Sequence, residues 1–302
     1  ITIYKKLFDE FVSIIDDKEE LIIIPDNILA YIPFEVLQTH EAKNPLNPNY
    51  LLHTKAISYG YSVNFLLQND KVIRTPKSNF LALAPITFNN ELTELTDSET
   101  EIDKINEFLN GTILKREQAT STNFLEVLND YNIIHISTHA DFDKDKTSWL
   151  WFADKKIKQT ELYTIKRQAD MVVLSACKTL DGELQRGEGL NSLSRGFFSA
   201  GAKSVLSSLW NTNDKSNTDI MITFYKQLQN NEQKNIALTH AKKEYLKTHF
   251  GVENSPYYWA SNTINGAVKT KMISSKSNTV YYMIAMLVAV IFMYMAYIKL
   301  KK

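Results

Sequence analysis

Residues 171–177 read Met-Val-Val-Leu-Ser-Ala-Cys, and this stretch decides the fold class. A short, continuous apolar run of this kind is typical of a strand that is buried on both faces of a parallel sheet. A similar run at residues 133–139, Ile-Ile-His-Ile-Ser-Thr-His, predicts a second such strand. Parallel strands of an open α/β sheet end at a common crevice. We therefore expect Cys177 and His139, the last residues of the two runs, to face each other.

Strand and helix patterns alternate on both sides of these two runs. Further strands are predicted at residues 21–24, 57–59, 80–84, 112–114 and 203–210. Amphipathic spacing predicts helices at residues 1–15, 98–109, 120–128, 189–200, 217–228 and 232–248. Residues 141–160 form a polar stretch. This alternation predicts an α/β fold with a mostly parallel sheet and helices on both faces.

Composition excludes several classes of protein. The chain has 302 residues, enough for one large domain or two small ones, and its formal net charge of zero provides no global field for nucleic acid. Cys177 is the only cysteine, which excludes an intramolecular disulfide and a zinc site built from several thiolates. The chain begins at Ile1 without an initiator Met or a signal peptide, so we expect it to be the C-terminal part of a longer protein.

The C-terminal region predicts a membrane anchor. Residues 280–298 contain no charged side chain, and about 20 apolar residues suffice for a helix to cross a bilayer. Tyrosines lie near both ends of this segment, where an aromatic belt would form. The alternative is a buried core helix, which a terminal segment that is apolar all round does not favour. Lysines flank the segment on both sides, so the sequence leaves open on which side of the membrane the body lies.

A cysteine and a histidine at neighbouring strand ends can form a nucleophile and its base. The imidazole converts the thiol into the reactive thiolate and can later protonate a leaving amine. This pattern favours His139 and Cys177 as catalytic residues, against the alternative that Cys177 is a small buried hydrophobic residue. His135 lies inside its apolar run and is interpreted as a core residue. The spacing of the two histidines occurs in zinc sites on helices, but this segment is a predicted strand without an intervening acid, so we expect no metal site.

The remaining site residues are predicted from their positions after the strand ends. The backbone N–H groups of Ala140 and Cys177 are the expected donors to an oxyanion. Acidic side chains in the neighbouring loops are candidates for binding a basic side chain of the substrate, with solvated loop charge as the alternative for each: Asp141, Asp181, Glu183, Glu188 and Asp214. Trp210 is a candidate wall of the same pocket, or a core residue.

The chain resembles the CHAT family, whose caspase-like domains often follow tetratricopeptide repeats. The resemblance rests on blocks in a fixed order: LIIIPD at 21–26, IPFE at 32–35, ISY at 57–59, HISTHA at 135–140, VLSAC at 173–177, GEG at 187–189, SRGFFSAGA at 194–202, SVLSSLW at 204–210 and PYYWA at 256–260. It implies a caspase–haemoglobinase fold, a three-layer α/β/α sandwich, with a cysteine peptidase dyad of His139 and Cys177. Two departures are small. Ala140 and Asn27 each stand where relatives have glycine, and asparagine tolerates a left-handed turn.

The sequence thus predicts five segments. They are a helical lead-in at residues 1–19 that ends a truncated N-terminal region, a CHAT peptidase domain at 20–268, a polar linker at 269–278, a transmembrane helix at 279–298 and a basic tail at 299–302.

The expected function is that of a membrane-anchored, caspase-like cysteine endopeptidase that works through an acyl-enzyme and needs no cofactor. Its partners would be a protein or peptide substrate, the membrane, and a regulatory protein or N-terminal repeat region, but not nucleic acid. The main alternative is a latent or catalytically inactive scaffold for protein assembly at the membrane. A weaker alternative is transfer of the acyl group to an amine instead of water, which the sequence does not separate from hydrolysis.

Overall fold

The computed structural model describes residues 1–269 and Met286, apart from residues 45–47, 70–77, 89–91, 144–146, 166–168, 176–182, 186–188 and 192. The chain divides into two compact units, Ile1–Met272 and Ile273–Lys302. The predicted linker, transmembrane segment and basic tail lie outside the described residues, except for Lys269 and Met286. In the part of the chain that is described, no helix has the length and apolar character required to cross a membrane.

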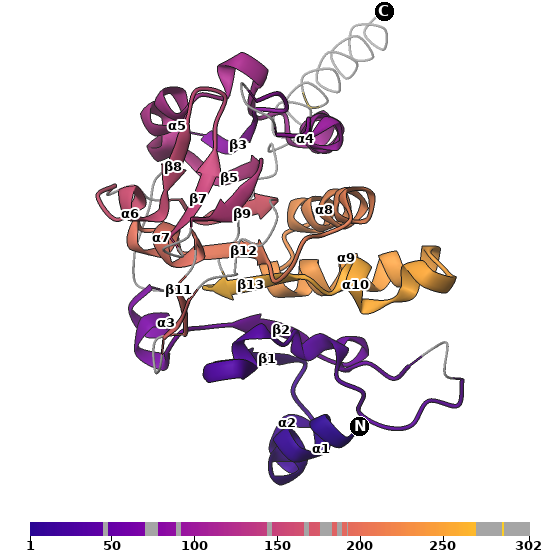
Figure 1. Cartoon of the computed structure of the whole chain (residues 1–302). Coiled ribbons are helices and arrows are strands. Elements are labelled where there is room, and N and C mark those ends of the chain that lie inside the picture. Colours follow the sequence, from indigo (N-terminus) through magenta and orange to yellow (C-terminus); the bar gives the residue numbers. More distant parts are fainter. Residues whose placement is uncertain are drawn as a thin grey trace, which may run out of the picture. The chain divides into compact units, whose positions relative to one another are not determined.

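An eight-stranded sheet forms the centre of the first unit (Figure 1). Its strands lie in the order β1 (Glu20–Ile23), β2 (Ala56–Tyr59), β13 (Asn262–Gly266), β12 (Ser204–Ser208), β9 (Met171–Ser175), β5 (Tyr131–Ser137), β3 (Ser78–Ala84) and β4 (Thr112–Lys115). Neighbouring strands are parallel except β12 and β13, which are antiparallel. The prediction of a mostly parallel sheet is confirmed. The antiparallel joint divides it into a part with five strands and a part with three strands that run the other way.

Helices cover both faces of this sheet (Figure 1). On one side lie α4 (Thr96–Leu109), α8 (Asp214–Gln229) and α9 (Lys234–Thr248), and on the other lie α5 (Ser121–Val127), α6 (Gln159–Leu162) and α7 (Leu193–Ser199). The remaining α-helices are α1 (Thr2–Phe8), α2 (Val12–Ile15), α3 (Val63–Asn69) and α10 (Pro256–Trp259). The unit therefore has helices, sheet and helices in three layers.

The two strands that decide the fold are buried on both faces, as their sequence predicts. Ile134 and Ile136 of β5 and Val172 and Leu174 of β9 belong to one apolar core cluster. His135, which alternates with the two isoleucines, faces α4 and α8 on the other side of the sheet. Burial of each aliphatic side chain contributes about 2 kcal/mol. These strands therefore fix the centre of the sheet, and with it the edge where they end.

The polar stretch at residues 141–160 contains strands that the sequence pattern does not predict. They contribute to a three-stranded antiparallel sheet made of β6 (Ala140–Phe142), β7 (Ser148–Trp151) and β8 (Lys156–Lys158). The side chains of β7 alternate between buried and half-buried. Charged residues on both sides of this strand hide that alternation in a scan for apolar runs. This small sheet matters for the site because β6 begins directly after His139.

Two helix starts differ from the prediction by three residues or more. The helix predicted at residues 189–200 begins only at Leu193, because residues 189–191 form β11 (Gly189–Asn191), which pairs with β10 (Glu183–Gln185) in a hairpin. The helix predicted from residue 217 begins earlier, at Asp214. Asn213 caps it, since its side chain accepts a hydrogen bond from the backbone N of Ser216.

The N-terminal residues pack into the same unit as the sheet. Phe8 of α1 contacts Phe34 edge to face, and both belong to an apolar cluster with residues of β1 and β2. The Pro-Asp-Asn turn after β1 has the left-handed conformation expected from the sequence, with a φ of 54° at Asn27.

Candidate active site

His139 follows β5 at the edge where the central strands end. Its imidazole Nε2 lies 2.7 Å from the backbone oxygen of Thr93, and its ring packs against Phe88 with the ring centroids 4.8 Å apart. Both contacts come from the segment between β3 and α4. The backbone is held as well, since the carbonyl of His139 accepts a hydrogen bond from Trp151 N at 3.0 Å and Thr138 Oγ1 donates to Trp151 O at 2.6 Å. Contacts on the ring and on the backbone therefore position this histidine.

The contact with Thr93 determines which ring nitrogen of His139 carries the proton. A backbone oxygen only accepts hydrogen bonds, so Nε2 is the N–H of the neutral ring. The lone pair then lies on Nδ1, which is the nitrogen that can take a proton from a nearby donor. His139 is half-buried, so its ring remains accessible to a substrate.

The strand that leads to Cys177 is the direct neighbour of β5. β5 and β9 are parallel, and Ser137 lies opposite Ser175 in their register. These serines are the residues two positions before His139 and two positions before Cys177. Cys177 itself lies outside the described residues, as do Asp181 and Glu188 of the predicted site. Of the proposed dyad, the structure therefore describes the histidine and the strand that precedes the cysteine.

Ala140 begins β6, and the pairing of β6 with β7 does not use its N–H group. Ala140 lies opposite Leu150, and the adjacent hydrogen bond of the ladder runs from Trp151 N to His139 O. In an antiparallel ladder this pattern makes Ala140 and Leu150 a non-hydrogen-bonded pair, whose N–H groups point away from the partner strand. The N–H of Ala140 therefore meets one requirement for an oxyanion donor.

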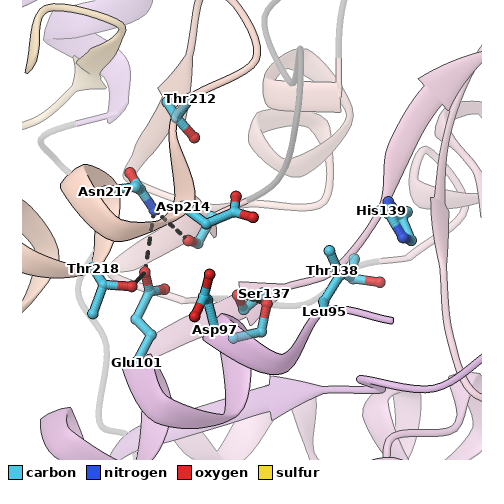
Figure 2. Close-up of a pocket in the computed structure, with 12 residues that line it drawn as sticks. Leu95, Asp97, Glu101, Ser137, Thr138, His139, Thr212, Asp214, Asn217 and Thr218 are labelled. Carbon is cyan, nitrogen blue, oxygen red and sulfur yellow. Dashed lines mark hydrogen bonds between the residues drawn. The ribbon is translucent and has the colours of Figure 1, made fainter. Parts of the chain in front are cut away.

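A pocket with a volume of about 30 Å³ lies beside His139 (Figure 2). Three carboxylates line it: Asp97 and Glu101 from α4 and Asp214 from the first turn of α8. Its described lining contains no lysine or arginine. The other polar side chains of the lining are Ser98, Ser137, Thr138, Ser175, Thr212, Asn217 and Thr218. The pocket is acidic, with enough room for a water molecule or a small cationic head group.

The pKa of Asp214 reflects the electrostatics of the pocket. Partial burial, together with the nearby carboxylates of Asp97 and Glu101, raises the pKa of the Asp214 carboxyl, and His139 opposes this rise. Like charges at short range disfavour the ionised form of each carboxyl. Three carboxyl groups therefore lie close together in a described lining without lysine or arginine, an arrangement that favours a cationic ligand.

The structure brings one of the predicted pocket acids to this pocket, namely Asp214. Asp141 is exposed on β6, where its Oδ1 accepts a hydrogen bond from Phe142 N at 2.9 Å, and it does not line the pocket. Trp210 is half-buried, and its Nε1 donates to Tyr257 O at 3.0 Å. Trp210 also lies outside the lining of this pocket.

His135 is a core residue, as predicted. Its side chain is completely buried, with Nε2 2.8 Å from Glu101 Oε1 and Nδ1 3.0 Å from the hydroxyl of Tyr225. Both ring nitrogens therefore have protein partners. Within the described residues, no group of three or more histidine, cysteine, aspartate or glutamate side chains is arranged to hold a metal ion.

The sequence does not single out Asp97, Glu101 or Asn217, which also line the pocket. Acids near the start of an amphipathic helix are expected from the helix dipole alone. Asn217 follows the start of another helix and carries no distinctive spacing. These residues become neighbours only because α4 and α8 pack side by side on the same face of the sheet.

The fold is similar to that of several solved structures. The complex of the pro- and mature domains of Porphyromonas gingivalis RgpB matches with a TM-score of 0.56 and 9% identity, covering 90% of this chain and 70% of that chain. The Arg-specific cysteine proteinase gingipain R (RgpB) matches with a TM-score of 0.53 and 9% identity, covering 90% and 68%. Saccharomyces cerevisiae separase, in its complex with securin, matches with a TM-score of 0.55 and 11% identity. That match covers 81% of this chain and only 15% of the separase chain. At such identities the likeness shows the fold alone.

Among curated proteins, none matches this chain in sequence. A family model does match: the model of the CHAT domain covers residues 2–267. The match begins in α1 and ends directly after β13, so it includes every strand of the central sheet and the residues that line the pocket. Because the match spans most of the sequence, this chain belongs to the CHAT domain family.

Proposed function

We propose that this chain is a cysteine endopeptidase in which Cys177 is the nucleophile and His139 is the base. The observation that carries the proposal is the placement of His139. Its Nδ1 bears the lone pair, it lies beside an acidic pocket, and it follows the strand adjacent to the one that leads to the single cysteine. Membership of the CHAT family and the caspase-like fold agree with this proposal, since gingipain R, which has a similar fold, is a cysteine proteinase.

The proposed reaction follows from the chemistry of the two side chains. His139 Nδ1 takes the thiol proton, and Cys177 Sγ attacks the carbonyl carbon of a peptide bond, forming an S–C bond. The N–H groups of Ala140 and Cys177 stabilise the oxyanion. The imidazolium then gives its proton to the leaving amine as the C–N bond breaks, which leaves a thioester. Water that loses a proton to His139 attacks the thioester, releases the carboxylic acid and restores the thiol.

The proposed substrate presents a basic side chain to the pocket formed by Asp97, Glu101 and Asp214. The support is the excess of carboxylates in the lining, which a lysine or arginine side chain would neutralise. Gingipain R, with a similar fold, is Arg-specific. The remaining predicted residues stay candidates for contacts with other parts of the substrate: Asp141, Asp181, Glu183, Glu188 and Trp210.

The proposal also includes a membrane anchor and control of access to the site. Residues 279–298 would hold the peptidase at a membrane as a single helix, and a regulatory protein or an N-terminal repeat region would control when a substrate reaches the pocket. Both parts rest on the sequence pattern.

The rate of Cys177 alkylation as a function of pH tests the dyad, because a chain with one cysteine gives one signal. In the native chain we expect fast labelling at about pH 6–7, since the imidazolium stabilises the thiolate. His139→Ala should move labelling to the range of a free thiol, with a pKa of about 8.5. His240→Ala is the matched control, because His240 is an exposed histidine paired with Glu232, and it should leave the profile unchanged. Identical profiles for the native chain and His139→Ala would contradict the dyad and favour the scaffold alternative.

A further inference from the structure

The side chain of Asn217 joins three elements beside the proposed site. It is buried, with 6% of its surface exposed. Its Nδ2 donates to Ser175 Oγ at 2.8 Å and to Glu101 Oε2 at 3.1 Å, and its Oδ1 accepts from Asn262 Nδ2 at 2.8 Å. Figure 2 shows the bond to Glu101 at the pocket. Both N–H bonds of the amide and its oxygen are therefore used, and they tie α8 to β9, α4 and β13.

This amide lies where the sheet separates. β9 and β12 are paired up to Val173 and Leu206. Beyond that point β9 pairs with β5 up to Ser175, whereas β12 pairs with β13, which begins at Asn262. Asn217 is bonded to Ser175 on one side of this separation and to Asn262 on the other. The backbone pairing with β12 does not extend to the end of β9. There, the side chain of Asn217 links β9 to β13 through hydrogen bonds instead.

The end of β9 is the part of the sheet that must be placed accurately for the proposed reaction. Ser175 stands two positions before Cys177. A displacement of about 1 Å at reacting atoms lowers a rate on the order of 100-fold. Building on the proposed function, we propose that Asn217 is a positioning residue: it holds the end of β9 through Ser175 so that Cys177 meets His139.

A purely structural role for Asn217 makes a different prediction. Glu101 is a buried carboxylate whose Oε1 contacts His135, and Asn217 is one of the donors to its Oε2. If Asn217 served only to satisfy Glu101, its loss would lower stability without changing the reactivity of Cys177 in the folded protein. The reactivity of the thiol, not stability, therefore separates the two roles.

The decisive variants are Ser175→Ala and Asn217→Asp, studied in the full chain. Ser175→Ala removes only the acceptor hydroxyl, so the fold should persist. Asn217→Asp keeps the size of the side chain, removes both N–H donors and sets a second carboxylate against Glu101. We expect each to slow alkylation of Cys177 at neutral pH by about 10- to 100-fold and to move its pH profile toward that of a free thiol. With a peptide substrate, Ser175→Ala, which changes no charge, should lower kcat while KM stays nearly constant.

A double-mutant cycle tests the route through Ser175. If Asn217 acts through this serine, Asn217→Ala should slow alkylation little further once Ser175→Ala is present, because the two changes break the same hydrogen bond. Asn235→Ala is the matched control: Asn235 is a buried asparagine on α9 whose Nδ2 donates to Glu20 Oε2 at 2.8 Å, away from the pocket. It should lower stability and leave the alkylation profile unchanged.

The outcomes separate this inference from the proposed function. If His139→Ala alters the alkylation profile but Ser175→Ala and Asn217→Asp do not, the dyad stands and the positioning role is wrong. If Ser175 and Asn217 contribute additively, the route through Ser175 is wrong. If His139→Ala has no effect, the proposed function itself fails.

Discussion

The carboxyl group of Asp214 gives the proposed pocket a pH dependence of its own. Its pKa is raised by partial burial and by the carboxylates of Asp97 and Glu101. The ionised form binds a cationic side chain, so kcat/KM for peptides with lysine or arginine should rise as the pH increases through this raised pKa. Asp214→Asn should remove that rise. It should also lower kcat/KM for basic peptides by about 10- to 100-fold, as expected for the loss of one charged hydrogen bond.

Matched peptides check this prediction for Asp214. A peptide with norleucine in place of the basic residue has a similar length and no charge, so its kcat/KM should change little between the native chain and Asp214→Asn. Equal losses for the basic and the norleucine peptide would show that Asp214 does not bind the substrate's charge. The exposed Glu126 on α5, which lies outside the pocket lining, provides the control variant Glu126→Gln.

At the same scale, the sequence reveals the position of some residues of the candidate site and not of others. The position of His139 could be predicted because the run before it encodes a buried strand and the residue after such a strand lies at a known edge of the sheet. Asp97, Glu101 and Asn217 could not, because helices carry them at positions that are ordinary for a helix surface. Their meeting depends on how α4 and α8 pack, which periodicity does not contain.

Among the elements, α9 is attached to the N-terminal part of the unit by a buried ion pair. Lys242 Nζ lies 2.9 Å from Glu35 Oε1, and the two side chains are 1% and 2% exposed. The hydroxyl of Tyr59, on β2, donates to the other oxygen of Glu35. Lys242→Ala would leave the charge of Glu35 buried without its cation. We expect this to lower the free energy of unfolding by about 3–5 kcal/mol, measured by urea denaturation.

The same helix offers a control for this ion pair. Lys247 and Glu244 form a pair at 3.1 Å, but their side chains are 71% and 52% exposed. Lys247→Ala should therefore cost less than about 1 kcal/mol. Replacing Lys242 and Glu35 together by apolar residues should recover part of the loss, because no charge then remains buried. An equal cost for Lys242→Ala and Lys247→Ala would show that the buried pair does not hold α9.

Elements differ in how far the sequence predicts them. The apolar strands β3, β5 and β9 are confirmed because burial on both faces leaves a continuous apolar run. β1 is confirmed as well, although it is an edge strand in which Ile22 is exposed. β13 reads Asn-Thr-Ile-Asn-Gly and is buried throughout, yet it carries no such run. Its place comes from the antiparallel pairing with β12 and from side-chain hydrogen bonds such as that of Asn262. A strand defined by long-range polar contacts leaves no local pattern to detect.

In the molecule as a whole, the β12–β13 joint holds together the two oppositely directed parts of the sheet. Gly266 ends β13 opposite Ser204. Its φ is +92°, and a Cβ at this position would meet the backbone oxygen of Lys203 and the ring of Phe198. The close approach of the two strands at their joint therefore depends on a residue without a side chain. The candidate site lies on the five-stranded part, and Asn262 of the three-stranded part donates a hydrogen bond to Asn217 beside it. The arrangement of this site therefore depends on the joint.

Gly266→Ala should lower the free energy of unfolding by about 3 kcal/mol, because a strained backbone conformation and a collision with backbone atoms act together. Gly251→Ala separates the two causes. Gly251 also has a positive φ, +66°, but a Cβ added there would have no atom within 4 Å, so only the backbone strain of about 1 kcal/mol should remain.

Urea denaturation followed by fluorescence and by circular dichroism should give coincident transitions for both variants if the two parts unfold together. Equal losses for the two alanine variants would mean that close packing at the joint contributes nothing beyond the φ preference. Separate transitions in Gly266→Ala alone would mean that the joint is what makes the two parts fold as one.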